Sequence, residues 1–273
     1  MRRLFIVLAV VVPLSVFTGC SKDGGINLFT LQQDIEFGRQ LDSSVMANPD
    51  EYKILDKATH PKAYEHLERV RDAILNSGLI TYKSEFEWQV KIIDNDEVLN
   101  AFAAPGGYMY FYTGLIKYLD NESQFAGVMA HEMAHADKRH STQTMTKTYG
   151  FDVLLSVLLG DKPSVMADVL GQLAKGATSL KFSREHEYQA DEFAVKYLNA
   201  TNGNSNYAPR EVAGFFEKLT AAGQSGKTPE FLSTHPSPEN RISEIERIWK
   251  ELGSKVGETY IDRYNEFKSS VSK

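Results

Sequence analysis

The chain has 273 residues, of which 42% are hydrophobic and 24% are charged, a balance that supports a packed core with a soluble surface and argues against intrinsic disorder. The formal net charge of −6 at pH 7 would on balance repel a phosphate backbone, so we expect no nucleic-acid partner. A single cysteine excludes an internal disulfide, and stability must therefore come from the core or from a bound metal.

The N-terminus has the three parts of a secretory signal. Arg2 and Arg3 precede an apolar run over residues 4–17, and Cys20 follows directly after Gly19. The run is shorter than the roughly 20 residues that span a bilayer. These features resemble a bacterial lipoprotein signal, and the alternative is an incidental thiol at Cys20.

The lipoprotein resemblance implies cleavage before Cys20, attachment of acyl chains to it and, because Ser21 follows it, sorting to the outer membrane. On this interpretation residues 1–19 are a signal peptide and residues 20–27 are a lipid-anchored linker. Residues 28–273 then form one folded domain.

The predicted elements begin with two helices and a strand. Residues 28–46 have the apolar spacing of an amphipathic helix. A second helix is predicted to begin at Pro61, with Thr59 or His60 near its cap, and to end near residue 76. Residues 86–93 alternate between apolar and polar positions as a strand does.

Residues 100–116 (NAFAAPGGYMYFYTGLI) contain a Pro-Gly-Gly turn signal followed by a segment in which tyrosines alternate with other residues. Tyr108, Tyr110 and Tyr112 follow directly after the Pro-Gly-Gly sequence at residues 105–107. A short strand entered through two glycines beside a proline predicts a sheet edge. The alternative is a simple hairpin with one aromatic face.

The remaining segments are predominantly helical, so the elements together predict a mostly helical α+β fold with a small sheet. Asn121 is predicted to cap a helix, with Gln124 in the reciprocal capping position. Residues 153–160 (VLLSVLLG) are too short to cross a membrane and are predicted to form a buried helix or a flap over a cleft. Further helices are expected at residues 184–198, 209–222 and 238–252.

The sequence HEMAH, residues 131–135, carries the strongest chemical signal. On a helix, His131 and His135 lie on one face and can aim ring nitrogens at one ion, with Glu132 beside them. This geometry suits zinc, and the alternative is a surface helix with two solvated histidines. A catalytic zinc usually has three protein ligands and one open position, so another ligand is needed.

His140 is the nearest further histidine, and its position argues against it. A nearby third ligand in the pattern HExxHxxGxxH would need glycine and histidine where the chain has Lys138 and Ser141. If the helix continued, His140 would lie about half a turn away from His131 and face away from the ion. We therefore expect His140 to be a polar residue at the helix end.

Residues 183–194 (SREHEYQADEFA) offer the missing ligand. A ligating histidine normally passes its other ring hydrogen to a carboxylate or carbonyl, so one acid should bind zinc and another should support a histidine. Glu187 and Asp191 are four residues apart and share a helix face, whereas Glu185 and His186 gain no acidic partner at that offset. We assign Glu187 to zinc and Asp191 to the support of a ligand histidine.

HExxH followed by ExxAD, with NAFAAPGG upstream and HPSPENRI downstream, resembles peptidase family forty-eight, the gluzincins related to HtpX, Oma and BepA. The resemblance spans about residues 100–242. It implies a zincin-like fold in which His131, His135 and Glu187 bind one Zn²⁺ per subunit and Glu132 is the general base.

The two flanking blocks carry further implications of this resemblance. NAFAAPGG resembles the edge strand on which these enzymes align an extended substrate, which implies that Asn100, Gly107, Tyr108 and Tyr110 bind substrate where the sheet edge borders the active-site cleft. The histidine of HPSPENRI, His235, is implied to gate the open zinc position or to donate to the transition state. The alternative for His235 is a helix-capping residue.

The resemblance is to a short, lipid-anchored periplasmic branch, because the chain lacks the long apolar segments of HtpX and room for the helical-repeat domain of BepA. We expect a zinc endopeptidase that cleaves unfolded or misassembled polypeptides at the outer membrane, with the envelope assembly machinery as a candidate partner. The alternative is a lipid-anchored holdase with a structural zinc, which would not need the base Glu132.

Overall fold

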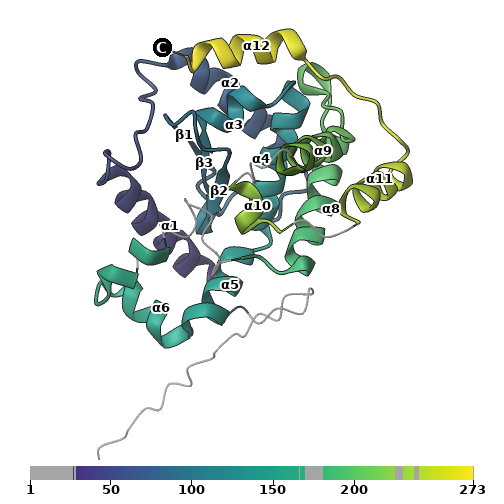
Figure 1. The fold of residues 1–273 in the computed structure, drawn as a ribbon. Helices are drawn as coiled ribbons and strands as arrows, with labels where there is room; N and C mark the ends of the chain where they lie inside the picture. Colours follow the sequence, from purple (N-terminus) through teal and green to yellow (C-terminus); the bar gives the residue numbers. More distant parts are fainter. Residues whose placement is uncertain are drawn as a thin grey trace, which may run out of the picture.

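The computed structural model of the chain describes residues 27, 29–165, 167–169, 181–224, 230–236 and 240–272, arranged as Figure 1 shows. The described helices are, in order, α1 (Leu31–Met46), α2 (Pro61–Leu75), α3 (Thr113–Tyr118), α4 (Glu122–Asp137), α5 (His140–Tyr149), α6 (Phe151–Leu158), α8 (Arg184–Ala200), α9 (Glu211–Gln224), α10 (Phe231–Thr234), α11 (Arg241–Glu251) and α12 (Ile261–Ser270). The predicted signal peptide, Cys20 and the linker up to residue 26 lie outside the described residues.

The sheet has three strands in the order β1–β3–β2. β1 (Gln89–Ile93) runs parallel to β3 (Tyr108–Tyr112), and β2 (Ala101–Ala104) runs antiparallel to it. The predicted sheet edge at residues 108–112 is therefore wrong, because β3 is paired on both sides. The alternative of a hairpin is confirmed: the 3-10 turn η1 (Pro105–Gly107), with both glycines at positive φ, folds β3 back beside β2.

Side chains of β3 alternate between two cores. Met109 and Phe111 belong to the main core with the buried apolar side chains of α4, which lies between the sheet and helices α8 and α9 (Figure 1). The three tyrosines of β3 belong to a second cluster with side chains of α1. Leu154 and Val157 of α6 join this second cluster, whereas the side chains around them are partly or largely exposed. The predicted helix is therefore confirmed, and it packs on this cluster by one face.

Side-chain caps determine where two helices begin. Thr30 and Gln33 form a capping box, so α1 begins at Leu31 rather than at residue 28. Asn121 caps α4 as predicted, by accepting a hydrogen bond of 2.9 Å from the backbone N–H of Gln124. The Gln124 amide oxygen accepts instead from the backbone N–H of Asp120 at 3.0 Å, so the predicted reciprocal bond is wrong.

The other predicted elements are confirmed with shifted ends. Pro61 is the first residue of α2. β1 begins at Gln89 rather than at residue 86, because Trp88 before it adopts a left-handed φ of 45°. α8 and α9 match the predicted helices closely, and α11 lies within residues 238–252, of which residues 238 and 239 lie outside the described residues.

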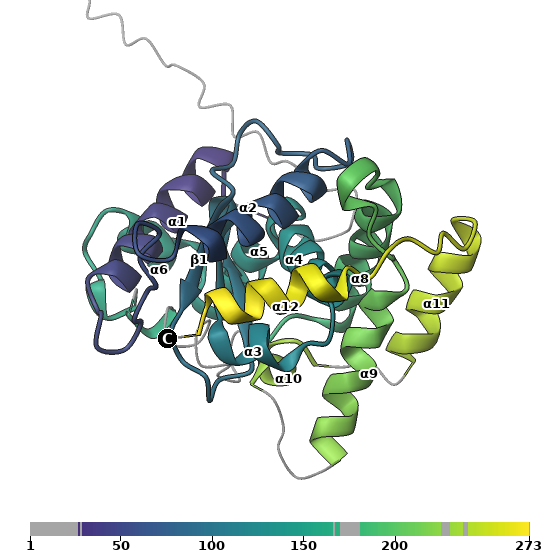
Figure 2. The same cartoon turned by 90° about the horizontal axis from the view of Figure 1, so that it is seen from above.

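Helix α12 lies beside α2 in both views (Figures 1 and 2) and also contacts α4. Buried Glu122, at the start of α4, anchors this packing. Its carboxylate forms an ion pair of 2.7 Å with Arg69 of α2, and Arg263 of α12 donates to it at 2.9 Å. These charged hydrogen bonds fix the N-terminal end of α4 from two sides.

The helices within the described residues all fall short of the length and apolarity that crossing a membrane requires.

Candidate metal centre

Helices α4 and α8 pack against each other and bring three donor side chains together. His131, His135 and Glu187 are fully buried. Nε2 of His131 lies 3.0 Å from Nε2 of His135, and the Glu187 carboxylate lies 3.6 Å and 3.5 Å from these two nitrogens. On another side of α4, Gly127 permits close packing against α9, since a Cβ added there would lie 3.2 Å from the Cα of Val212.

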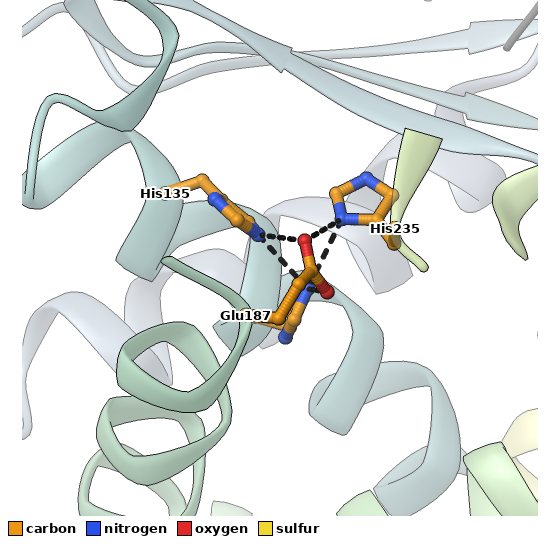
Figure 3. A group of neighbouring side chains, drawn as sticks. His135, Glu187 and His235 are labelled. Carbon is orange, nitrogen blue, oxygen red and sulfur yellow. Dashed lines mark hydrogen bonds and ion pairs between the residues drawn. The ribbon is translucent and has the colours of Figure 1, made fainter. Parts of the chain in front are cut away.

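His235, at the C-terminal end of α10, completes a group of four donors. Ligand atoms of His131, His135, Glu187 and His235 all lie within 4.8 Å of one another. Figure 3 shows His135, Glu187 and His235 converging from different elements. Nδ1 of His235 lies 3.1 Å from Oε1 of Glu187 and 3.3 Å from Nε2 of His131.

These donors fit one zinc ion by chemistry and by spacing. Imidazole nitrogens and a carboxylate oxygen are ligands that zinc prefers. Tetrahedral zinc with bonds of about 2.0–2.1 Å separates its ligand atoms by about 3.3–3.4 Å. The contacts of 3.0 Å between the α4 histidines and 3.6 Å between His131 and Glu187 bracket this separation.

Asp191 lies behind His131, in the position that a supporting carboxylate requires. Its Oδ1 is 2.9 Å from Nδ1 of His131, which leaves Nε2 of that ring directed at the other donors. Asp191 is on the same face of α8 as Glu187, as the four-residue spacing predicted.

Arg241, the first residue of α11, received no role from the sequence pattern. It is 1% exposed, and its guanidinium lies 3.4 Å above the ring of Phe216. Nη2 is 2.7 Å from Oδ1 of Asp191 and 3.0 Å from Oε2 of Glu187. Arg241 therefore forms ion pairs with the carboxylates of both α8 residues, and its place in the HPSPENRI block was the only signal for it.

His140 is buried beside the donors, so the prediction of a polar residue at the helix end is wrong. α4 ends at Asp137, and Arg139 adopts a left-handed φ of 61° before α5 begins at His140. This turn brings Nδ1 of His140 within 2.9 Å of Nδ1 of His135, where a continuous helix would have carried it away. Burial lowers the pKa of His140 to about 3, which keeps the ring neutral.

Glu132 is buried beside the donors. It is 1% exposed, and its Oε1 lies 3.4 Å from Nε2 of His235. Burial raises the pKa of Glu132, and the neighbouring His235 and His131 only partly oppose this shift. A buried carboxylate with a raised pKa is suited to accepting a proton near neutral pH.

The predicted substrate-binding residues do not form the edge that borders this centre. Tyr108 and Tyr110 project into the second core cluster, where the Tyr110 hydroxyl donates to Asp42 at 2.6 Å. Gly107 lies in the turn η1, and Asn100 is fully buried just before β2. The prediction of substrate pairing along residues 107–112 is wrong because neighbouring strands already pair with β3 on both sides.

The sheet edge that faces the donors belongs to β2. In its antiparallel register with β3, alternate residues Leu99, Ala101 and Ala103 direct their backbone groups away from β3. The backbone groups of Leu99 are already hydrogen-bonded to the N-terminal end of α10. Oε2 of Glu230 accepts from the Leu99 N–H at 3.1 Å, and the Phe231 N–H donates to the Leu99 carbonyl at 3.2 Å.

Aromatic rings cover the donors from two directions. Phe182 stacks on His135 with ring centroids 3.9 Å apart, and Phe231 stacks on His235 at 4.2 Å. His235 itself is 1% exposed. The donors are therefore shielded on these two sides by aromatic rings.

Comparison with known proteins matches the model of peptidase family M48 to residues 58–249. The beta-barrel assembly-enhancing protease of Escherichia coli (strain K12) is 33% identical over 183 residues, which cover 63% of this chain and 37% of that protein. The protein of the same name in Yersinia pestis is 31% identical over 213 residues, with 73% and 42% covered. The mitochondrial metalloendopeptidase OMA1 of Schizosaccharomyces pombe is 30% identical over 192 residues, with 68% and 53% covered. The chain thus spans less than half the length of these two bacterial relatives.

Proposed function

The chain belongs to peptidase family M48, a family of zinc metallopeptidases, and we propose that it is a zinc-dependent endopeptidase. The observation that carries the proposal is the position of Glu132. This carboxylate is buried beside the donors His131, His135 and Glu187 without belonging to the donor group. A site that held zinc only for structure would not need a further buried carboxylate, which disfavours the holdase alternative.

His131, His135 and Glu187 would hold the zinc. A bound zinc supplies Lewis acidity and lowers the pKa of a coordinated water. Glu132 takes a proton from the water that attacks the scissile carbonyl, and it returns a proton to the nitrogen as the peptide C–N bond breaks. Asp191 and Arg241 keep His131 and Glu187 oriented while this proton moves.

His235 is proposed to gate this chemistry. One ring nitrogen faces Glu187 at 3.1 Å, and the other faces Glu132 at 3.4 Å, so the imidazole stands between the donors and the base. Water and substrate need that position, and His235 must leave it before hydrolysis. The alternative, a hydrogen bond to the developing oxyanion, would keep His235 close to the scissile bond instead.

The substrate is proposed to be an unfolded or extended polypeptide. The backbone groups of Ala101 and Ala103 on β2 point away from β3, where an added strand would be held mainly by main-chain hydrogen bonds. Such a strand would have to displace the Ser141 hydroxyl, which donates to the Ala103 carbonyl at 3.4 Å. Such recognition favours exposed, unfolded chain over a particular sequence. It replaces the predicted pairing along residues 107–112.

We place this activity in the periplasm, at the outer membrane. The support is the lipoprotein-like signal with Cys20 and the similarity to proteins named for enhancing beta-barrel assembly. Misassembled envelope proteins would then be the natural substrates, and the envelope assembly machinery a candidate partner.

Incubation of the zinc-loaded chain with unfolded casein tests the activity. We expect cleavage that a zinc chelator abolishes. The matched control is Glu132→Gln, which should keep its zinc while cleavage falls by roughly 10²–10⁴-fold. If casein stays soluble but intact with the parent chain and with an opened His235→Ala variant, the holdase replaces the endopeptidase.

The anchor is tested separately by Cys20→Ser. This change should release the protein from the membrane fraction or leave it unprocessed, as a fractionation with immunoblotting would show. A processed Cys20→Ser protein that stays in the membrane fraction would overturn the lipid anchor without affecting the proposed chemistry.

A further inference from the structure

The two donor histidines of α4 differ in what lies behind them. A ligating histidine normally donates its second ring hydrogen to a carboxylate, a carbonyl or water. Behind His131 the acceptor is Asp191, 2.9 Å from Nδ1. Behind His135 it is another imidazole, since Nδ1 of His140 lies 2.9 Å from Nδ1 of His135.

One arrangement of hydrogens lets His135 bind a metal through Nε2. Its Nε2 lone pair must be free, so Nδ1 carries the hydrogen and donates to Nδ1 of His140. His140 then accepts at Nδ1 and, as a neutral ring, carries its own hydrogen on Nε2. The amide oxygen of Gln189 lies 2.7 Å from that Nε2 and is the acceptor.

We propose that His140 and Gln189 are positioning residues that fix the tautomer and ring orientation of His135 for zinc. The inference deepens the zinc site proposed above and rests on it, but it does not depend on peptide hydrolysis. The hydrogen-bonded chain runs from α4 through α5 to α8, so it ties His135 to the same helix that carries Glu187.

The charges of the buried centre explain why this partner is neutral. The two positive charges of zinc and the one of Arg241 balance the carboxylates of Glu132, Glu187 and Asp191. A fourth carboxylate behind His135 would leave an uncompensated negative charge in a buried site. A neutral imidazole backed by an amide supplies the hydrogen-bond acceptor without that charge.

NMR of the full chain with nitrogen-labelled histidines, loaded with zinc, reads the tautomers directly. We expect the ring hydrogen of His140 on Nε2 and that of His135 on Nδ1. A hydrogen on Nδ1 of zinc-loaded His140 would overturn the proposal, and this measurement requires no substitution.

Gln189→Leu removes the acceptor at a partly exposed position and should weaken zinc binding roughly 10- to 100-fold in a chelator competition. Gln189→Glu keeps an acceptor, and its charge would be partly solvated because position 189 is only partly buried, so this variant should bind zinc at least as tightly as the parent chain. The matched control is His186→Phe, because His186 stacks on His140 at 4.3 Å but stands outside the hydrogen-bonded chain. It should leave zinc affinity unchanged.

A purely structural role would be visible as a lower melting temperature of metal-free Gln189→Leu with unchanged zinc affinity, and this outcome overturns the proposal. Failure of the parent chain to bind zinc would instead overturn the proposed function. Zinc binding by the parent with the opposite tautomer would reject only the role of His140 and Gln189.

Discussion

The four donors divide unequally: three have partners behind them, which we call the supported half, and His235 alone makes up the unsupported half. Three donors stand on α4 and α8, helices of 16 and 17 residues, whereas His235 stands at the end of α10, which has 4 residues. His131 and His135 each have a hydrogen-bond partner behind the ring, and Glu187 has the ion pair with Arg241. Among the residues that the structure describes, the ring nitrogens of His235 face Glu132, Glu187 and His131. Support from behind therefore separates the three donors that we propose as permanent ligands from His235, which we propose is displaced.

The two halves also differ in what it costs to move them. Displacing α4 or α8 would open the main core, to which both helices contribute buried side chains. A single helical turn such as α10 has no independent stability, so its position depends on tertiary contacts, including those of Phe231, which is fully buried in the same main core. The hydrogen bonds to Leu99 are among the contacts that hold it.

Among changes to the supported half, Glu187→Ala should have the largest effect on zinc binding and activity. We expect zinc binding and proteolysis to be lost together, because only the two α4 histidines and His235, which has no partner behind its ring among the described residues, would remain as donors. Zinc content by elemental analysis and casein cleavage measure the effect. Glu185→Ala, on the exposed side of the same helix turn, is the control and should keep both properties. Full zinc occupancy in Glu187→Ala would return the ligand role to Glu185 or His186.

Arg241→Met should cost about 3–5 kcal/mol in the metal-free protein, because it leaves Glu187 and Asp191 buried without their cation. Bound zinc supplies positive charge at the same place, so the loss should be smaller in the zinc-loaded protein. Denaturant unfolding with and without zinc measures the difference. Arg247→Met, on the same helix but in exposed ion pairs, should leave the midpoint unchanged. Equal losses with and without zinc would contradict the assigned role.

His235→Ala tests the unsupported half. If His235 is a gate, the variant should keep its zinc and cleave casein faster than the parent. If it donates to the oxyanion, turnover should fall by roughly a hundredfold. His60→Ala is a matched control, because Thr-His-Pro also occurs at residues 59–61 away from the centre. Equal behaviour of both variants would leave His235 as a capping residue.

Glu230→Ala should give the smallest effect. It removes the hydrogen bond to the Leu99 N–H, worth about 1 kcal/mol, and should raise basal cleavage about fivefold by favouring displaced α10. The increase should disappear in a His235→Ala background, where the gate is already absent. If Glu230→Ala raised cleavage equally in the His235→Ala background, Glu230 would act independently of His235.

Local periodicity was sufficient to predict the supported half. The rotation of 3.6 residues per turn places His131 with His135 and Glu187 with Asp191, whatever the rest of the chain does. The helix cap at Asn121 and the start of α2 at Pro61 also depend on local residue types, so they could be predicted without knowledge of the fold. Zinc chemistry then supplied the need for a third ligand on a second helix.

Tertiary structure decided the features that depend on a single backbone angle or on contacts between distant segments. The left-handed turn at Arg139 brings His140 beneath His135, and a pattern based on continued helix cannot foresee it. Pairing with β1 makes β3 the central strand, because whether a strand lies at the edge of a sheet depends on which other strands pair with it. The position of Arg241 depends on how α11 packs against α8, because ion pairs between helices distant in the sequence have no local signature.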